Sequence, residues 1–217
     1  MNENPIAFIG EMVSAILDGR KTQTRRILKV QPTVTESRLR ELGAWNPDLT
    51  LSQHVNQAWQ AGFICVKCPL GEVGDQLWVQ EDFALSVIDP DGGSPEDEPE
   101  NYDVIYRDGD VPLGGWTDGA GNAIPAPWQG ASNMPRWASR IRLEITDIRI
   151  ERLNDISEAD AIAEGLELTL RGWKSTKYQH VFYTPPIMAF QDLWGFTGGD
   201  WDANPWVWVI SFKCVQS

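Results

Sequence analysis

Hydrophobic and polar positions alternate most clearly in the stretch RIRLEITDIRIERL of the final third of the chain. Ile141, Leu143 and Ile145 share one face of an extended segment, and the alternation then moves by one residue to Ile148 and Ile150. One extra residue between two alternating runs is the pattern that a β-bulge produces. The sequence therefore predicts a long strand with a bulge between Ile145 and Ile148.

Other strands are predicted close to both ends of the chain. The closing stretch WVWVISFK places Trp206, Trp208, Ile210 and Phe212 on one face. Shorter strands are expected in PIAFIG near the N-terminus, in QLWVQ after a Gly-Asp turn, and in DVIYR. These strands are few and irregularly spaced, and the chain shows no internal repeat.

Apolar residues at helical spacing predict helices between these strands. Gly19 and Gly165 are placed to end two of them, and Ser157 is placed to cap the start of one. The stretch with helical character after residue 36 is interrupted at Asn46-Pro47. The predicted helices cover residues 11–19, 36–62, 157–165 and 185–195. Together with the strands, they predict an α+β fold built on a small mixed sheet or barrel with flanking helices.

One domain over residues 1–217 is expected, with an insertion at about residues 84–132. Residues 89–103 contain seven acids and three prolines and no base, and residues 109–130 are rich in Gly and Pro. Such composition favours a solvated surface loop over a lid that covers a site.

The overall composition excludes several classes of protein. A net charge of −13 argues against a protein that coats nucleic acid by charge alone. No apolar run is long enough to span a membrane and no signal peptide is visible, so we expect a cytoplasmic protein without a membrane partner. Cys65, Cys68 and Cys214 are too few for a four-ligand zinc site, so no metal and no cofactor is expected.

Positive charge gathers in the stretch GRKTQTRRILK, which contains no acid. In a turn or a helix cap, Lys21 and Thr24 can converge, and burial beside other cations would lower the pKa of the lysine amine. A neutral amine can act as a general base for a hydroxyl nucleophile. The alternative is that these cations form ion pairs with the abundant acids elsewhere. The cations are Arg20, Lys21, Arg25, Arg26 and Lys29.

The stretch ILDGRKTQTRR resembles the signature of the ASCH domain, a small β-barrel related to the PUA fold. That family's motif runs Gly-x-Lys-x-x-Glu-x-Arg, and here Gly19, Lys21 and Arg26 match. Thr24 stands where many members have Glu, as in a subset of bacterial amidohydrolases that deacetylate acetylcytidine. The remaining motifs, among them MPRWASRI and WDANPWVW, are similar to those of phage- and prophage-encoded ASCH-like proteins.

For the site, the resemblance implies Lys21 as base, Thr24 as nucleophile and Glu81 as acid. The substrate would be an acylated pyrimidine nucleoside or nucleotide, and the neighbouring arginines Arg20, Arg25 and Arg26 would bind an oxyanion or a phosphate.

Two other hypotheses on the function stay open. A non-catalytic PUA-like module would bind single-stranded RNA or a modified base, with Arg136 holding phosphate and Trp78 or Trp137 stacking on bases. Both tryptophans are also plausible core residues. Alternatively, a small acidic phage protein would bind a host protein, in which case Thr24→Ala leaves its function intact.

Overall fold

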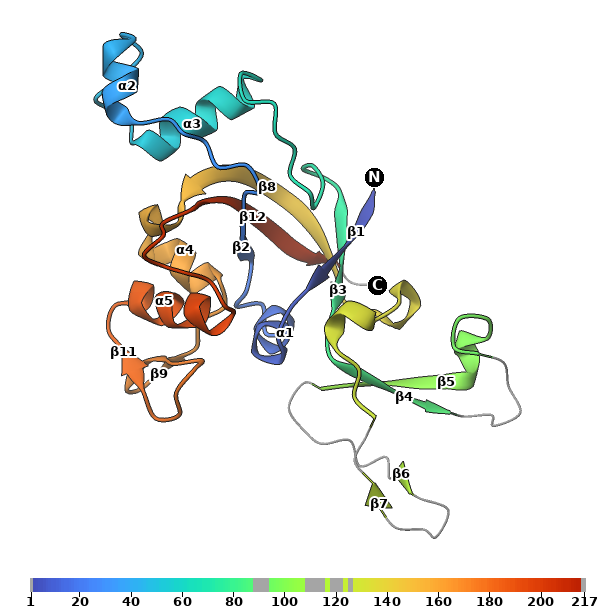
Figure 1. The fold of residues 1–217 in the computed structure, drawn as a ribbon. Helices are drawn as coiled ribbons and strands as arrows, with labels where there is room; N and C mark the ends of the chain where they lie inside the picture. Colours follow the sequence, from blue (N-terminus) through green and yellow to red (C-terminus); the bar gives the residue numbers. More distant parts are fainter. Residues whose placement is uncertain (1, 88–93, 108–115, 118–122, 125–126, 216–217) are drawn as a thin grey trace.

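The computed structural model describes residues 2–87, 94–107, 116–117, 123–124 and 127–215. Its centre is a five-stranded mixed sheet with the strand order β1-β3-β8-β12-β2 (Figure 1). The strands of this sheet are β1 (Glu3–Ala7), β2 (Gln23–Ile27), β3 (Gln76–Gln80), β8 (Arg142–Arg152) and β12 (Trp206–Val215). This confirms the mixed α+β class. A closed barrel is not confirmed, because β1 and β2 are the two edges of an open sheet.

Helices and short strands surround the central sheet. The observed helices lie where the sequence predicted helices. The long helical region after residue 36 is divided into two helices, as the Asn46-Pro47 interruption indicates. The helices are α1 (Gly10–Leu17), α2 (Glu36–Glu41), α3 (Leu51–Gln60), α4 (Glu158–Ala163) and α5 (Pro186–Phe196). The single turns are η1 (Pro99–Asn101), η2 (Ala131–Asn133), η3 (Arg136–Ala138) and η4 (Leu153–Asp155). The small sheets contain β4 (Phe83–Val87), β5 (Tyr102–Tyr106), β6 (Trp116–Thr117), β7 (Ala123–Ile124), β9 (Leu168–Thr169), β10 (Gly172–Lys174) and β11 (Phe182–Tyr183).

The predicted bulge lies in β8. Asp147 pairs with Ser211 of β12 and Ile145 pairs with Phe212, so Thr146 is the extra residue. The bulge moves Ile148 onto the face that Ile145 also occupies, and both are buried. One extra residue thus keeps both apolar runs of β8 on the core side of the sheet.

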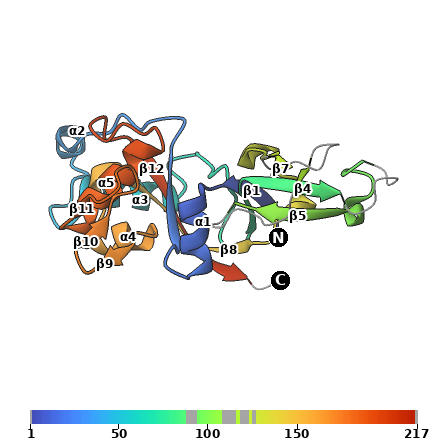
Figure 2. The same ribbon diagram turned by 90° about the horizontal axis from the view of Figure 1, so that it is seen from below.

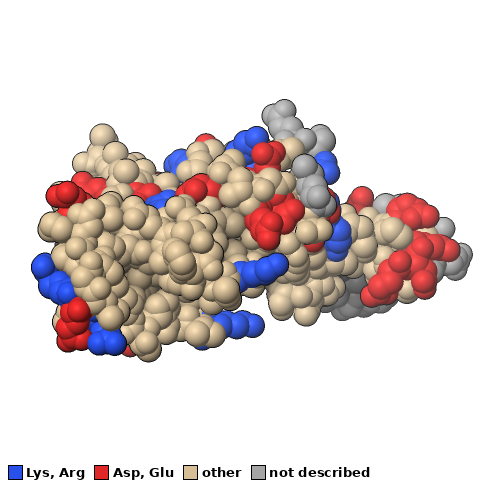
Figure 3. Space-filling view, turned by 90° about the horizontal axis from the view of Figure 1, so that it is seen from above, with Lys and Arg blue, Asp and Glu red and all other residues tan. Residues whose placement is uncertain are grey.

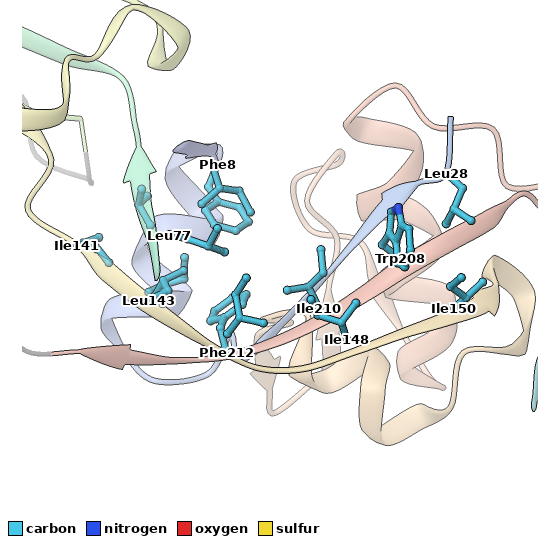
Figure 4. Packing of buried hydrophobic residues seen from close by; sticks show 14 of the residues in the cluster. Phe8, Leu28, Leu77, Ile141, Leu143, Ile148, Ile150, Trp208, Ile210 and Phe212 are labelled. Atoms are coloured by element: carbon cyan, nitrogen blue, oxygen red, sulfur yellow. The ribbon is translucent and has the colours of Figure 1, made fainter. Parts of the chain in front are cut away.

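Strand β12 divides the core into two layers because its alternate residues point to opposite faces. Trp206, Trp208, Ile210 and Phe212 lie on one face, as predicted, and they join the cluster that also contains residues of α1 and α3. The residues between them, Val207 and Val209, pack against α4 and α5. Figure 4 shows the first cluster, with Phe8 facing the sheet from the turn before α1.

The predicted insertion is partly described. Its base is closed by a bridge between Phe83 and Gln129, and β4 pairs with β5 as a hairpin. The predicted surface loop over 89–103 lies partly outside the described residues; its described part ends in η1 and β5. Seen from below, the molecule is elongated, with this hairpin at one end and α2–α5 at the other (Figure 2). Acidic side chains gather at the hairpin end (Figure 3). Within the described ranges, no helix has both the length and the apolar character needed to cross a bilayer.

Helix α1 joins the two edge strands and thereby defines the position of the basic stretch. The helix ends at Leu17, and Gly19 follows it with a φ of 73°, as expected of a residue after a helix C-terminus. The main-chain N–H groups of Arg20 and Lys21 both donate to Ala15 O. Lys21 then forms an isolated bridge with Glu164, directly before Gly165.

Gly165 is the position where α1, the basic stretch and α4 meet most closely. Its φ is 97°, and a Cβ atom there would lie 2.8 Å from Cβ of Lys21 and 2.9 Å from Cβ of Ala15. Gly165→Ala is expected to lower the free energy of unfolding by about 2–4 kcal/mol, because left-handed strain and steric overlap both contribute. Urea unfolding followed by tryptophan fluorescence measures this change.

Gly62→Ala is the matched control for this prediction. Gly62 also has a positive φ, of 80°, but a Cβ there would meet nothing within 4 Å. Gly62→Ala should therefore lower the free energy of unfolding by only about 1–2 kcal/mol, because left-handed strain is its sole contribution. Equal losses in the two variants would contradict the close approach of Lys21 and Gly165.

Candidate functional site

Lys21 is buried and fully hydrogen bonded. Its side chain is inaccessible to solvent, and its Nζ atom donates to Gln23 O at 2.9 Å, Glu164 O at 2.9 Å and Glu164 Oε2 at 2.8 Å. Burial lowers the pKa of the Lys21 amine, while the Glu164 carboxylate opposes that shift. An ammonium group has three hydrogens, and three acceptors take them here. Lys21 therefore ties the C-terminal end of α4 to the start of β2.

Arg25 is the second buried cation of the stretch and is surrounded by acids. Its Nη1 atom donates to Glu164 Oε1 at 3.1 Å and to Gln23 Oε1 at 2.6 Å. Its Nη2 atom lies 3.3 Å from Glu151 Oε2 and 3.6 Å from Asp160 Oδ2. Glu164 thus contacts Lys21 with one carboxylate oxygen and Arg25 with the other. This buried ion network, Lys21–Glu164–Arg25, joins β2, β8 and α4.

Arg20 and Arg26 differ in their partners. Arg20 is bound to Asp18 at 2.8 Å and to Gly165 O at 2.8 Å. Arg26 donates from Nη2 to Ala7 O at 2.9 Å, and its guanidinium lies 5.4 Å from the centre of the Phe8 ring. Burial lowers the pKa of Arg26. Among the cations at positions 20–26, Arg26 is the one that has no acid within ion-pair distance in the described part of the chain.

Two pockets adjoin Arg26. The smaller pocket, of about 300 Å³, lies between β2 and α5, and the larger one, of about 630 Å³, lies beside the N-terminus of α1. Met12, Arg26 and Thr197 line both. We call the two pockets together the Arg26 cleft. Volumes in this range are typical of sites for small molecules.

Thr24 lines the smaller pocket. The residue is buried, and its hydroxyl makes no hydrogen bond to the residues that the structure describes. Lys21 binds other acceptors, as given above, and lines neither pocket of the Arg26 cleft. The structure thus places Thr24, Arg25 and Arg26 at the cleft, with Lys21 behind them.

Glu81 follows the end of β3 and is also buried. Its carboxylate is held by Arg140, with Nε to Oε1 at 3.0 Å and Nη2 to Oε2 at 2.8 Å. The Arg140 guanidinium stacks on the ring of Tyr106, 3.9 Å from its centre. Glu81 lines neither pocket of the Arg26 cleft. The pair instead connects the central sheet to the β4–β5 hairpin.

The remaining predicted binding residues lie away from the Arg26 cleft. Arg136 forms a two-bond ion pair with Glu3 on the surface. Trp137 packs against the small cluster of Phe83, Met134 and Ala138, and Trp78 is half-buried on β3. Neither tryptophan lines either pocket of the cleft. Their predicted role in stacking on bases stays a prediction.

The soft metal ligands are not gathered in one place. Cys65 and Cys214 are exposed and Cys68 is half-buried, and all three are free thiols. Burial raises the pKa of the Cys68 thiol. No group of three potential metal ligands occurs among the residues that are described.

Glu164 is the central site residue that the sequence reasoning missed. A signal for it exists: Glu164 lies at the C-terminal end of α4, where the helix dipole disfavours an acid. An acid at this position is stabilised by a nearby cation, and in the structure Lys21 and Arg25 both bind Glu164. Helix α5 also contributes Phe190, Leu193 and Trp194 to the smaller pocket. The sequence holds no comparable signal for these residues, because their place in the pocket depends on how α5 packs against β2.

Comparisons with known proteins leave the family open. No family model matches the chain, and no curated protein matches it. Among solved structures, the crystal structure of an ASCH domain from Lactobacillus crispatus JV V101 is similar over 98% of this chain and 79% of that chain, with 11% sequence identity and a TM-score of 0.36. A likeness at that TM-score carries no argument, so the ASCH resemblance rests on the motifs in the sequence.

Lys21→Met tests whether the buried ion network is needed for folding. The change removes one of the two cations that bind the buried Glu164 carboxylate and leaves one of its oxygens without a cation, so the free energy of unfolding should fall by about 3–5 kcal/mol. Denaturant unfolding at neutral pH measures the change.

Lys174→Met is the matched control. Lys174 forms an ion pair of the same length, 2.8 Å, with Glu167, but both side chains are at least half exposed. Lys174→Met should therefore lower the free energy of unfolding by less than about 1 kcal/mol. A Lys21→Met protein as stable as this control would show that the network is not needed for folding.

Proposed function

We propose that the Arg26 cleft binds a nucleotide, either free or as one unit of a single-stranded nucleic acid. The observation that supports this most is Arg26 itself: a half-buried cation that lines both pockets and has no acid within ion-pair distance among the described residues. A guanidinium in this position is suited to a phosphate, to which it donates charge-assisted hydrogen bonds.

The N-terminus of α1 supports the same assignment for the larger pocket. Gly10, Glu11 and Met12 line it. The Met12 N–H donates to Ile9 O, but the N-cap residue Ile9 has no side-chain acceptor for the N–H groups of Gly10 and Glu11. Free N–H groups at a helix N-terminus favour an anion. The phosphate would therefore lie between Arg26 and the start of α1.

The acids around the larger pocket limit what can enter it. Glu11 and Asp82 line it, and Asp82 lies 3.5 Å from Arg107. Together with the net charge of −13, these acids disfavour a long polyanion. A single phosphate group fits this balance better than a duplex.

Amide hydrolysis on an acylated pyrimidine nucleoside is the second candidate. It is favoured by the Thr24 hydroxyl, which lines the smaller pocket and makes no hydrogen bond in the described chain. Against it, Lys21 would have to give up a proton while Gln23 O and Glu164 accept all its hydrogens. Glu81, already paired with Arg140, would have to act as the acid. Binding without chemistry needs neither step.

Arg26→Gln tests nucleotide binding. Calorimetric titration with uridine 5′-monophosphate should show an affinity loss of about 10- to 100-fold, because a charge-assisted hydrogen bond is removed. Arg20→Gln is the matched control, since Arg20 is held by Asp18 and lines neither pocket. Equal affinity in the Arg26→Gln and wild-type proteins, or no binding by the wild type, would overturn the proposal.

Thr24→Val tests the hydrolase. Deacylation of N4-acetylcytidine, followed by chromatography, should fall by roughly a thousandfold or more if Thr24 is the nucleophile. Thr22→Val is the control, because Thr22 is exposed and only two residues away. Turnover that survives in Thr24→Val would exclude Thr24 as the nucleophile, and a wild-type protein without turnover would exclude the hydrolase.

A further inference from the structure

The smaller pocket of the Arg26 cleft is lined by two residues with unused hydrogen-bond donors. Arg25 Nε and Trp194 Nε1 are both buried and have no hydrogen-bond partner within the described residues. The side chain of Arg25 is inaccessible to solvent and Trp194 is 8% exposed, and both residues line this pocket. Buried donors are almost always paired, so two at one pocket call for an explanation.

The charged acceptor in the wall of the same pocket is already in use. Glu164 lines it, but one carboxylate oxygen binds Lys21 and the other binds Arg25. The Thr24 hydroxyl also lines the pocket and can accept, but neither of the two donors is hydrogen bonded to it. A ligand that completes these hydrogen bonds must bring an acceptor of its own.

Charge decides which acceptor is suitable. The positive charge of Arg25 is compensated by Glu164, Glu151 and Asp160, which Lys21 and Arg149 also bind, so Arg25 has no free charge to offer to an anion in this pocket. The opposite walls are apolar, from Met12, Phe190 and Leu193 among others. A neutral carbonyl oxygen on a flat ring satisfies both conditions, whereas a phosphate does not.

We propose that the pocket between β2 and α5 binds the base of the nucleotide and recognises a ring carbonyl oxygen through Arg25 Nε and Trp194 Nε1. The ligand class is a nucleotide with a keto-bearing base, with its phosphate at Arg26. This inference rests on the proposed function and adds to it a division of the cleft into a neutral base pocket and a phosphate pocket.

Neither donor nitrogen is exposed to solvent, so a ligand reaches them only after the wall of the pocket moves, and the turn after α5 is the part that covers Trp194. Gly199 lies so close to the indole that a Cβ atom there would overlap Trp194 Nε1. Gly198 has a φ of 88°, a conformation that glycine adopts without strain. A shift of the turn 197–199 would uncover the indole N–H for the carbonyl oxygen.

Trp194→Phe tests the inference because it removes the N–H and keeps an aromatic ring. Its affinity for uridine 5′-monophosphate should fall about three- to tenfold, while its affinity for ribose 5-phosphate, which has no base, should stay unchanged. Trp201→Phe is the matched control: Trp201 packs against the same core cluster, on Phe190, but does not line the pocket. It should bind both ligands as the wild type does.

An NMR titration with uracil examines the base pocket without phosphate. In protein labelled with 15N-tryptophan, the indole signal that is missing from Trp194→Phe should shift as uracil is added. If uridine 5′-monophosphate binds wild type and Trp194→Phe equally and uracil leaves the indole signal unmoved, the inference fails while the proposed function stands. If neither uridine 5′-monophosphate nor ribose 5-phosphate binds the wild type, both fail.

Discussion

The buried ion network around Glu164 is the interaction on which the rest of the structure depends. One carboxylate, 3% exposed, binds Lys21 with one oxygen and Arg25 with the other. Charges inside a protein are tolerated only when they are paired and hydrogen bonded. Here the pairing holds the edge strand β2, the end of α4 and, through Glu151, strand β8 in one arrangement. The smaller pocket lies directly beside this network.

The network also explains why positive charge gathers near the N-terminus of an acidic chain. Lys21 and Arg25 are needed to compensate buried acids, and Arg20 ties the same stretch to Gly165 O. The charges of these three residues are therefore bound by partners within the fold. Arg26, at the next position along β2, bridges to Ala7 O on the opposite edge strand and faces the cleft. A ligand site that depends on one arginine is compatible with a net charge of −13, because it attracts a single phosphate more than a polymer.

Local patterns in the sequence were sufficient to predict much of the fold. The slip in alternation after Ile145 predicted a bulge before Ile148, and the structure has Thr146 as its extra residue. Ser157 caps α4 through the Asp160 N–H, as its position indicated. The site was harder to predict, because its partners are far apart in the chain: Glu164 is 143 residues from Lys21. The open sheet, and the pairing of Glu81 with Arg140, likewise depend on long-range packing that residue spacing does not encode.

The charge state of Lys21 tests this account most directly. The side chain of Lys21 can be followed by NMR in lysine-labelled protein as the pH is raised, with its signal assigned by its loss in Lys21→Arg. We predict an ammonium group at neutral pH, because three acceptors including a carboxylate hold its hydrogens even though burial lowers its pKa. A neutral amine at pH 7 would contradict the structural role of Lys21 and would support its action as a general base toward Thr24.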